Sequence, residues 1–586
     1  MIDTMPQVTP TRRLGMRPIT LAAALLCGLL SAPAVANERA ELERLRGTTL
    51  NLIKLLVDGG LLSQEKAEQL VKQAQQDAAP ADAAAAQPAV PAAATAGAPR
   101  SGVIRVPYVP ESLRNQMRDE IKQEVLNQAR SERWGEPGAL PAWARRINFE
   151  GDVRFRLQSE DWDRRNVSAA EAEGLAFQND AAYEGPIAWS PDLTNTQDRR
   201  DRMTLRARFG LTSDLAFGFK TGLRLSTGNA QAVSTSQTLG GSNGNFSKYS
   251  VLLDRAWIQW TPHQPDVTAI VGRFSSPYFG GDLIWPDDMN FDGVAVKATH
   301  AFNDANKVFV NAGAFPLSEF QSDAADAWLY GAQVGAIFKP DASSQFDIGL
   351  GYYDFNNVEG NFDPMYRDTA NTFSAADKSY LSSEYKKAVR QRGNTLIRIN
   401  QPVAAAGSTT AVAPVWGLAS KFRPLTLSAA YNHQGFEGLS MRISADFINN
   451  TAFSQADIRR RAQPGANIDL AKKTHAWQAR AQIGSTKQEL LGDWSAYLGW
   501  RRFERDAWVD AFTDTTWHLG GTNYVGWTLG GAYYVGPRTS LGARVTSTRN
   551  LTDGRTETLS GGAEVPNLSS IRQRVDVLQV ELNSRF

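Results

Sequence analysis

Residues 149–158 read FEGDVRFRLQ, and they form the clearest alternating stretch of the chain. Its odd-numbered positions are apolar or glycine, and its even-numbered positions are charged or polar. A strand places successive side chains on opposite faces. The stretch therefore predicts a strand with one apolar face and one face rich in arginine.

Similar stretches follow to the end of the chain. Residues 203–211 and 217–225 alternate in the same way, after a long polar loop near 159–200 and with only a short turn, 213–215, between them. Segments of about 10 residues with alternately long and short connections are typical of a transmembrane antiparallel β-barrel. With the first three, the further strands that we expect make sixteen: 252–261, 267–274, 293–300, 307–315, 327–338, 345–355, 415–431, 439–450, 475–485, 493–504, 523–535, 539–549 and 572–586.

The strand count has one open alternative. Pro424 interrupts 415–431, which is either one long strand or two short ones, and an additional hairpin within 356–414 would raise the count to eighteen. Either number is even, so both ends of the barrel lie on the same side of the membrane.

Composition supports an all-β membrane protein. The 62 Lys and Arg residues nearly balance the 61 Asp and Glu residues, so bulk charge does not indicate a nucleic-acid partner. Glycine (48), tryptophan (15) and 10% aromatic residues fit strands with aromatic belts. The mean hydropathy of −0.35 argues against a helical membrane protein. It does not argue against a barrel, because a barrel exposes only every second residue of its strands to lipid.

The N-terminus predicts export. Three arginines precede an apolar run at 19–30, and Ala34-Val35-Ala36 follows, which is the order of a signal peptide over 1–36. The alternative, a membrane anchor, needs about 20 apolar residues. Cys27 is the only cysteine, so the mature chain has no thiol or disulfide chemistry.

Three segments precede the barrel. Residues 37–77 predict amphipathic helices, with Leu42, Leu45, Thr49, Leu52 and Leu56 at alternating spacings of three and four. These helices either form a coiled coil or fray on a tether. Residues 78–104 are an Ala/Pro-rich linker, 105–146 a helix and turn-rich lead-in, and 147–586 the barrel.

The polar faces of the strands predict a basic interior. Four acids share these faces, Glu150, Asp152, Asp446 and Glu581. Desolvating so many charges would be costly, so we expect water to fill the interior. The fourteen cations are Arg154, Arg156, Arg206, Arg208, Lys220, Arg224, Arg255, Arg273, Lys297, Arg442, Arg480, Arg501, Arg544 and Arg585.

The segment 275–292 carries four further acids, Asp282, Asp287, Asp288 and Asp292. Folded inward, it would face the arginines and set a transverse field at a constriction. Folded outward, it would be an external loop with solvated carboxylates. Asp287-Asp288 lacks the spaced ligands and the glycine of an EF-hand loop, so we predict no metal site.

No catalytic motif is present. The five histidines stand singly, without an HExxH, a CxxC or a nucleophile elbow. We therefore predict neither an enzyme nor a cofactor. A barrel-embedded hydrolase is the alternative, because its Ser, His and Asn would lie on neighbouring strands without a local motif.

Several blocks resemble the proteobacterial "putative porin" family. They are Val106–Pro110, Gly151–Arg154, Gly272–Phe274, Glu504–Ala507 and Gly520–Asn523, and the resemblance runs from about residue 40 to the C-terminus without the linker. It implies an outer-membrane β-barrel channel and implies no solute. Phe586 resembles the terminal aromatic assembly signal of bacterial outer-membrane proteins, although Ser584 departs from that pattern.

We therefore expect a porin in outer-membrane lipid, inserted by the barrel-assembly machinery, that passes small hydrophilic solutes or ions with a mild preference for anions. Its helical N-terminus would lie in the periplasm and promote a homo-oligomer, a trimer. An energised transporter would need about 22 strands and a folded plug. Two further alternatives are a barrel that mainly tethers the envelope through its helical arm and an outer-membrane hydrolase.

Overall fold

The chain divides into two units, Met1–Glu120 and Ile121–Phe586. The computed structural model describes residues 146–168, 195–230, 232–241, 244–262, 266–319, 326–363, 383–400, 415–436, 438–466, 470–551 and 572–586, and the short pieces 123, 468, 556–558 and 564–566. The predicted signal peptide, the helices of 37–77, the linker and almost all of the lead-in lie outside these residues. No helix in the described part of the chain is long and apolar enough to cross a membrane.

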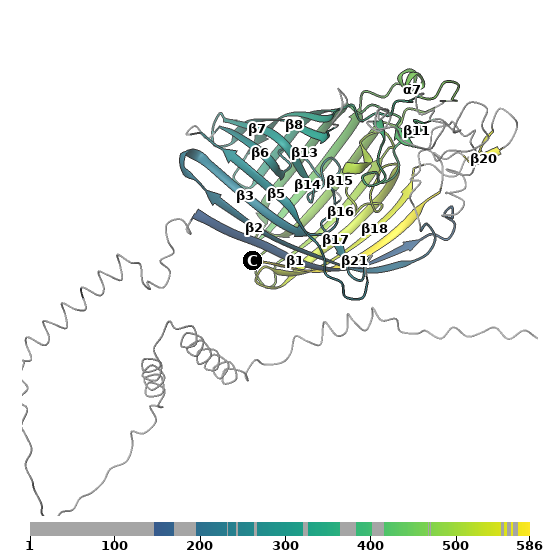
Figure 1. The fold of residues 1–586 in the computed structure, drawn as a ribbon. Helices are drawn as coiled ribbons and strands as arrows, with labels where there is room; N and C mark the ends of the chain where they lie inside the picture. The colour runs from purple at the N-terminus through teal and green to yellow at the C-terminus, as the bar shows by residue number, and fades with distance from the viewer. Residues whose placement is uncertain are drawn as a thin grey trace, which may run out of the picture. The chain divides into compact units, whose positions relative to one another are not determined.

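Sixteen antiparallel strands form one closed wall (Figure 1), which confirms the predicted count. Each strand pairs with its neighbours in sequence, and β21 closes the barrel on β1. A two-residue strand, β4 (Gln237–Thr238), adds to β2. The wall strands are β1 (Ile147–Trp162), β2 (Arg200–Asp214), β3 (Phe219–Thr227), β5 (Val251–Trp260), β6 (Val267–Ser275), β7 (Asn290–Ala301), β8 (Asn306–Ser318), β9 (Ala327–Phe338), β10 (Ser344–Asn356), β13 (Pro424–Phe436), β14 (Leu439–Asn450), β15 (His475–Ser485), β16 (Trp494–Phe503), β17 (Tyr524–Gly536), β18 (Thr539–Asn550) and β21 (Arg574–Arg585).

The outer face of the wall is apolar and the inner face polar. On β9, Val334 is 51% exposed and its neighbour Gln333 only 2%; on β10, Ile348 is 49% exposed and Asp347 only 8%. Aromatic pairs gather at both ends of the strands, as in the girdles of membrane barrels. Toward the short turns lie Phe149–Phe209, Phe219–Trp260 and Phe338–Phe346, and toward the long connections lie Trp328–Tyr330 and Trp477–Trp500.

The seam between β1 and β21 explains one glycine. The backbone N–H of Gly151 donates to the Phe586 carbonyl, and the N–H of Phe586 donates to the Gly151 carbonyl, at 3.1 and 3.0 Å. A Cβ on Gly151 would lie 2.2 Å from the Phe586 ring. Only glycine therefore leaves room for the C-terminal aromatic ring to pack on the first strand.

The connections differ at the two ends of the barrel. One end has turns of two to eight residues, and the other has connections of eight to 67 residues, the longest being 357–423. The predicted turn at 213–215 is wrong, because β2 continues to Asp214. The chain turns in the short helix η2 (Ala216–Gly218) instead, where Phe217 and Gly218 adopt positive φ. A Cβ at Gly218 would collide with the Thr261 carbonyl at 2.0 Å.

Pro424 starts β13 rather than interrupting it, since proline has no N–H to donate and is tolerated at the first position of a strand. The single long strand over 415–431 is therefore wrong. Trp416–Leu418 form a separate strand, β12, which pairs with β11 (Leu396–Arg398) and forms an isolated bridge from Leu418 to Glu359. This hairpin lies outside the wall sheet, so the eighteen-strand alternative is also wrong. The remaining elements of the long connections are α7 (Gln455–Arg461), η3 (Asp510–Phe512), β19 (Thr556–Thr558) and β20 (Glu564–Pro566).

Candidate functional site

Three connecting segments pack together inside the barrel: 276–289, 383–400 and 504–523. The ring of Trp285 lies 4.9 Å from that of Trp508 and 5.4 Å from that of Tyr353 on the wall strand β10. Trp508 and Tyr353 are fully buried. The expectation that water fills the whole interior is therefore wrong, because an aromatic core occupies part of it. Strand alternation could not predict this core, since loops supply most of it.

Hydrogen bonds join two of these segments. The amide of Asn394 donates to the carbonyls of Arg505 and Trp508 at 2.5 and 2.8 Å, and the Thr395 hydroxyl donates to the Asp506 carboxylate at 2.7 Å. The backbone N–H of Asp510 donates to Asn394 Oδ1 at 2.7 Å. Burial raises the pKa of Asp510 to about 6. The 504–523 block, which carried much of the family resemblance, thus forms a fixed interior structure.

The segment 276–289 crosses the interior. At one side, the Asp282 carboxylate lies 2.9 Å from Arg501 on β16 and 3.1 Å from Arg480 on β15. At the other, Asp288 lies 3.0 Å from Arg206 and 3.4 Å from Arg208, both on β2. Burial opposes ionisation of Asp282, but the two arginines outweigh it and hold the pKa of this carboxyl below its usual range.

Gly281 lets this segment approach the wall closely. Its N–H donates to Asp446 Oδ1 on β14 at 3.0 Å, and a Cβ would lie 2.3 Å from the other Asp446 oxygen. The backbone of Phe279 is likewise held by Gln333 on β9, which accepts from its N–H at 2.8 Å and donates to its carbonyl at 2.6 Å. Wall strands far apart in the sheet therefore hold one loop.

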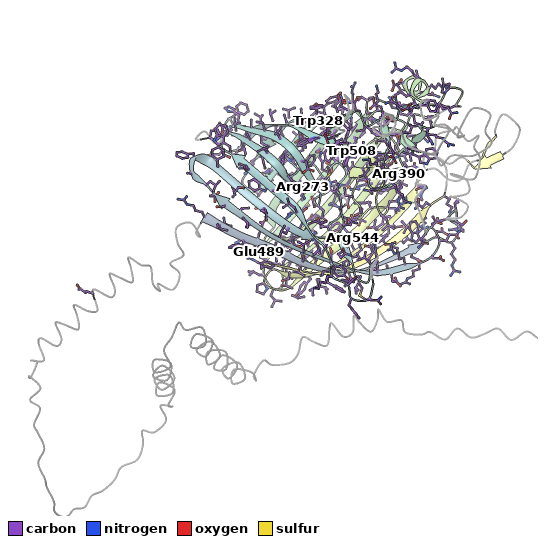
Figure 2. All side chains as sticks on the ribbon, viewed as in Figure 1. Arg273, Trp328, Arg390, Glu489, Trp508 and Arg544 are labelled. Carbon is purple, nitrogen blue, oxygen red and sulfur yellow. The ribbon has the colours of Figure 1, made fainter. Side chains whose placement is uncertain are left out.

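A polar cavity of about 870 Å³ remains beside the loop. Five carboxylates line it: Asp282, Asp287, Asp288, Asp514 and Glu581. Arg544 lies on the wall well below Trp508 of the aromatic core in the view of Figure 2. The ten arginines that line the cavity are Arg154, Arg156, Arg202, Arg206, Arg208, Arg224, Arg255, Arg480, Arg544 and Arg585.

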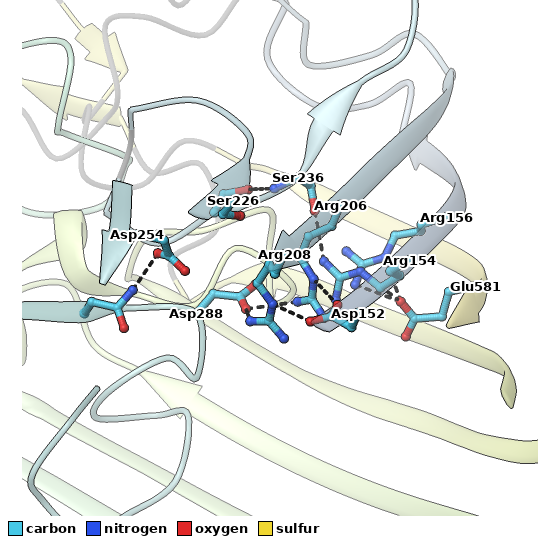
Figure 3. A network of polar contacts seen from close by, with 12 residues as sticks. Asp152, Arg154, Arg156, Arg206, Arg208, Ser226, Ser236, Asp254, Asp288 and Glu581 are labelled. Atoms are coloured by element: carbon cyan, nitrogen blue, oxygen red, sulfur yellow. Dashed lines mark hydrogen bonds and ion pairs between the residues drawn. The ribbon is translucent and has the colours of Figure 1, made fainter. Parts of the chain in front are cut away.

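A network of ion pairs joins β1, β2 and β21 on this wall (Figure 3). Arg154 and Arg206 stand directly opposite each other in the β1–β2 register. Like charges opposite one another destabilise a sheet, but acids surround this pair. Asp152 lies 2.8 Å from Arg206, and Glu581 lies 3.7 Å from Arg154 and 3.0 Å from Arg156. The paired arginines are thus less free to act on a solute than the sequence suggested.

The other predicted lumen cations lie elsewhere. Arg501 is fully buried under the loop, 4.4 Å from the Trp517 ring, and Lys220 pairs with Asp214 at a short turn. Lys297 is exposed on β7 and lines none of the cavities described here. Arg442 lines a smaller cavity of about 170 Å³, which also borders Asp282. Arg273 pairs with Asp292 at 2.6 Å beside a separate apolar cavity.

Three charged residues of this interior, Arg202, Asp254 and Asp514, are not among those expected from the sequence. Arg202 shares the parity of Arg206, so extending the predicted strand 203–211 by one residue at its start would have found it. Asp254, which pairs with Arg224 at 2.6 Å, sits at a register shift between β3 and β5 that alternation cannot reveal. Asp514 belongs to an inward loop, for which the sequence carried no positional signal.

Within the part of the chain that the structure describes, no group of three His, Cys, Asp or Glu residues could hold a metal ion. His518 is buried between the Thr548 hydroxyl at 2.8 Å and Asn550 Oδ1 at 3.0 Å. Burial lowers its pKa to about 3, so it packs as a neutral ring.

The solved structures that are similar to this chain match it at low identity. "Anion-selective porin from Comamonas acidovorans" is 12% identical, covers 75% of this chain and 99% of its own, and has a TM-score of 0.36. OprB of Pseudomonas putida is 11% identical over 76% and 95%, with a TM-score of 0.38. The outer-membrane channel DcaP of Acinetobacter baumannii is 8% identical over 75% and 97%, with a TM-score of 0.35.

No curated protein matches the chain. A family model does: the one described as "Putative porin" matches residues 46–586, which is nearly the whole chain. This match confirms the resemblance drawn from the sequence blocks and agrees with the closed sixteen-strand wall and its polar interior cavity of about 870 Å³. The chain therefore belongs to the "putative porin" family and is a β-barrel channel of the outer membrane.

Proposed function

We propose that this porin passes small hydrophilic solutes passively and prefers anions. The observation that carries the proposal is the lining of the polar cavity, ten arginines against five carboxylates. Fixed positive charge lowers the free energy of an anion in the bore and raises that of a cation. The preference is modest, because Asp152 and Asp254 also neutralise arginines of this wall.

Within this route, we propose the segment 276–289 as the constriction. Its carboxylates at Asp287 and Asp288 border the cavity opposite arginines of the wall, which supports a transverse field at the narrowest part. Nine of the fourteen cations expected in the lumen border this cavity, and we propose these nine as pore-lining residues. The other five, Lys220, Arg273, Lys297, Arg442 and Arg501, do not border it.

A salt-gradient measurement tests the selectivity. The full-length protein in a planar bilayer, with KCl concentrations differing about tenfold, should give a reversal potential on the chloride side. The bias should shrink at high salt, because the Debye length falls from about 10 Å at 0.1 M to about 3 Å at 1 M. A reversal potential on the potassium side at low salt would contradict the proposal.

We further propose that residues 1–36 are removed on export, that the helices of 37–77 lie in the periplasm, and that they promote a trimer. The support is the leucine spacing and the marginal stability of such short helices alone. Native mass spectrometry of the protein with and without residues 37–100 tests the assembly. The same oligomer in both would refute the role of the helices.

No observation favours the hydrolase or the envelope tether over a channel. For the tether, deletion of 37–100 should leave single-channel conductance unchanged while cells lose envelope integrity. Intact envelopes after the deletion would exclude it.

A further inference from the structure

A second cavity, of about 290 Å³, lies beside the polar one and is lined mainly by apolar side chains. Its wall includes Phe291, Phe315, Phe512, Leu329 and Leu418, and all of these except Phe512 are at most 2% exposed. An engineered cavity of about 150 Å³ with a similar lining binds benzene. The cavity here is large enough for one substituted aromatic ring.

The two cavities adjoin through the inward loop. Asp287 and Asp288 border the polar cavity, and the next two residues, Met289 and Asn290, border the apolar one. Val233 lines both. A molecule in the apolar cavity is therefore one side chain away from the arginine-lined cavity.

Polar groups at the boundary suit a carboxylate. Asn290 accepts from Arg255 Nε at 2.8 Å and donates to Asp254 at 2.7 Å, so it ties the apolar cavity to an arginine of the polar one. The Arg273 side chain lines the apolar cavity directly, is 29% exposed, and pairs with Asp292, whose side chain is 56% exposed. An exposed pair of this kind is weak and exchanges readily with a solute carboxylate.

We propose that the apolar cavity binds small aromatic carboxylates, with the ring among the phenyl side chains and the carboxylate at Arg273, and that it feeds them into the polar cavity. Phe291 and Phe315 lie 4.8 Å apart edge to face, so an added ring finds both faces and edges to pack on. This proposal rests on the proposed anion preference, and it specifies small aromatic carboxylates as one class of the anions that pass.

A comparison of benzoate with acetate in the same bilayer experiment distinguishes the effect of the aromatic ring from that of the negative charge, because both anions carry a carboxylate and only benzoate has a ring. With the full-length protein and a constant chloride current, benzoate should interrupt the current at a concentration about tenfold or more below that of acetate. The reason is that burial of the apolar ring makes the binding free energy of benzoate more favourable than that of acetate. Equal concentrations for the two anions would overturn the proposal.

Val389 gives a direct variant, because it lines the apolar cavity and is 51% exposed. V389D places a negative charge in the lining, and V389W fills it; both should remove the advantage of benzoate over acetate. F246D is the matched control, since Phe246 is fully exposed on another long connection and lines neither cavity. It should behave like wild type. If benzoate still interrupts the current at a lower concentration than acetate in both Val389 variants, the proposed site is refuted.

The KCl reversal potential distinguishes the two proposals. Chloride selectivity with no benzoate advantage removes the aromatic site and leaves the anion preference intact. Potassium selectivity removes the anion preference, whatever benzoate does.

Discussion

Asp288 of the inward loop and Arg206 of β2 form an ion pair of 3.0 Å in the interior of the barrel. Arg206 also pairs with Asp152 at 2.8 Å on the neighbouring strand. The Arg206 guanidinium therefore joins the wall to the inward loop. Part of its positive charge, which the strand pattern predicted to face a solute, is neutralised by these two carboxylates.

Loop attachment should depend strongly on Asp282. D282N removes the carboxylate that faces the fully buried Arg501, and breaking a buried pair costs about 3–5 kcal/mol. We expect a lower free energy of unfolding in a urea titration and noisier single-channel current. D292N is the control, because Asp292 is 56% exposed in its pair with Arg273, and such pairs contribute about 0–1 kcal/mol. Equal losses in the two variants would show that the loop is held by other contacts.

A new charge should lower the free energy of unfolding on the outer face of β14 and leave it nearly unchanged on the inner face. Ile443 points outward and is 47% exposed, whereas Ser444, the next residue, lines the small polar cavity. I443R should destabilise the barrel by about 2–4 kcal/mol if Ile443 lies at mid-bilayer depth. S444R should fold with nearly the wild-type free energy, measured by refolding into lipid vesicles. A similar penalty for both would mean that the assigned faces are wrong.

Lower pH should strengthen the anion preference. Burial, together with the neighbouring Asp282 carboxylate, raises the pKa of Asp287 and of Asp514 above the ordinary aspartate value of 3.8. These two groups lose their negative charge at a higher pH than an ordinary aspartate does, while the arginines stay charged. The reversal potential should therefore move further to the chloride side between pH 7 and about 4. The double variant D287N/D514N should show a flatter profile, and an unchanged profile would exclude these two carboxylates as its cause.

The wall could be predicted from the sequence because alternation is local. Val334 beside Gln333 and Ile348 beside Asp347 carry the inside–outside assignment in adjacent residues, and sixteen such segments gave the count. The turn positions could be predicted less accurately from the sequence. The turn after β2 contains positive φ at Phe217 and Gly218, and Gly218 lies close to Thr261, which belongs to another turn.

The interior could be predicted only in part. Arg154 and Arg206 followed from parity, and so did two acids that pair with them, Glu581 and Asp152. The other partners of the wall arginines come from a register shift at Asp254 and from the inward loop at Asp282 and Asp288. The aromatic core depends on where Trp285 and Trp508 meet, which is a long-range contact without periodicity in the sequence.

The central claim is that arginines of the polar cavity set the selectivity. Two of them, Arg544 and Arg585, can be neutralised without breaking an ion pair in the described part of the chain. Arg544 donates to the Gln579 amide oxygen, and Arg585 lines the same cavity. We predict that R544Q/R585Q keeps its conductance and moves the low-salt reversal potential in a KCl gradient toward the potassium side, whereas D287N moves it toward the chloride side. Reversal potentials that match the wild type in both variants would contradict the account.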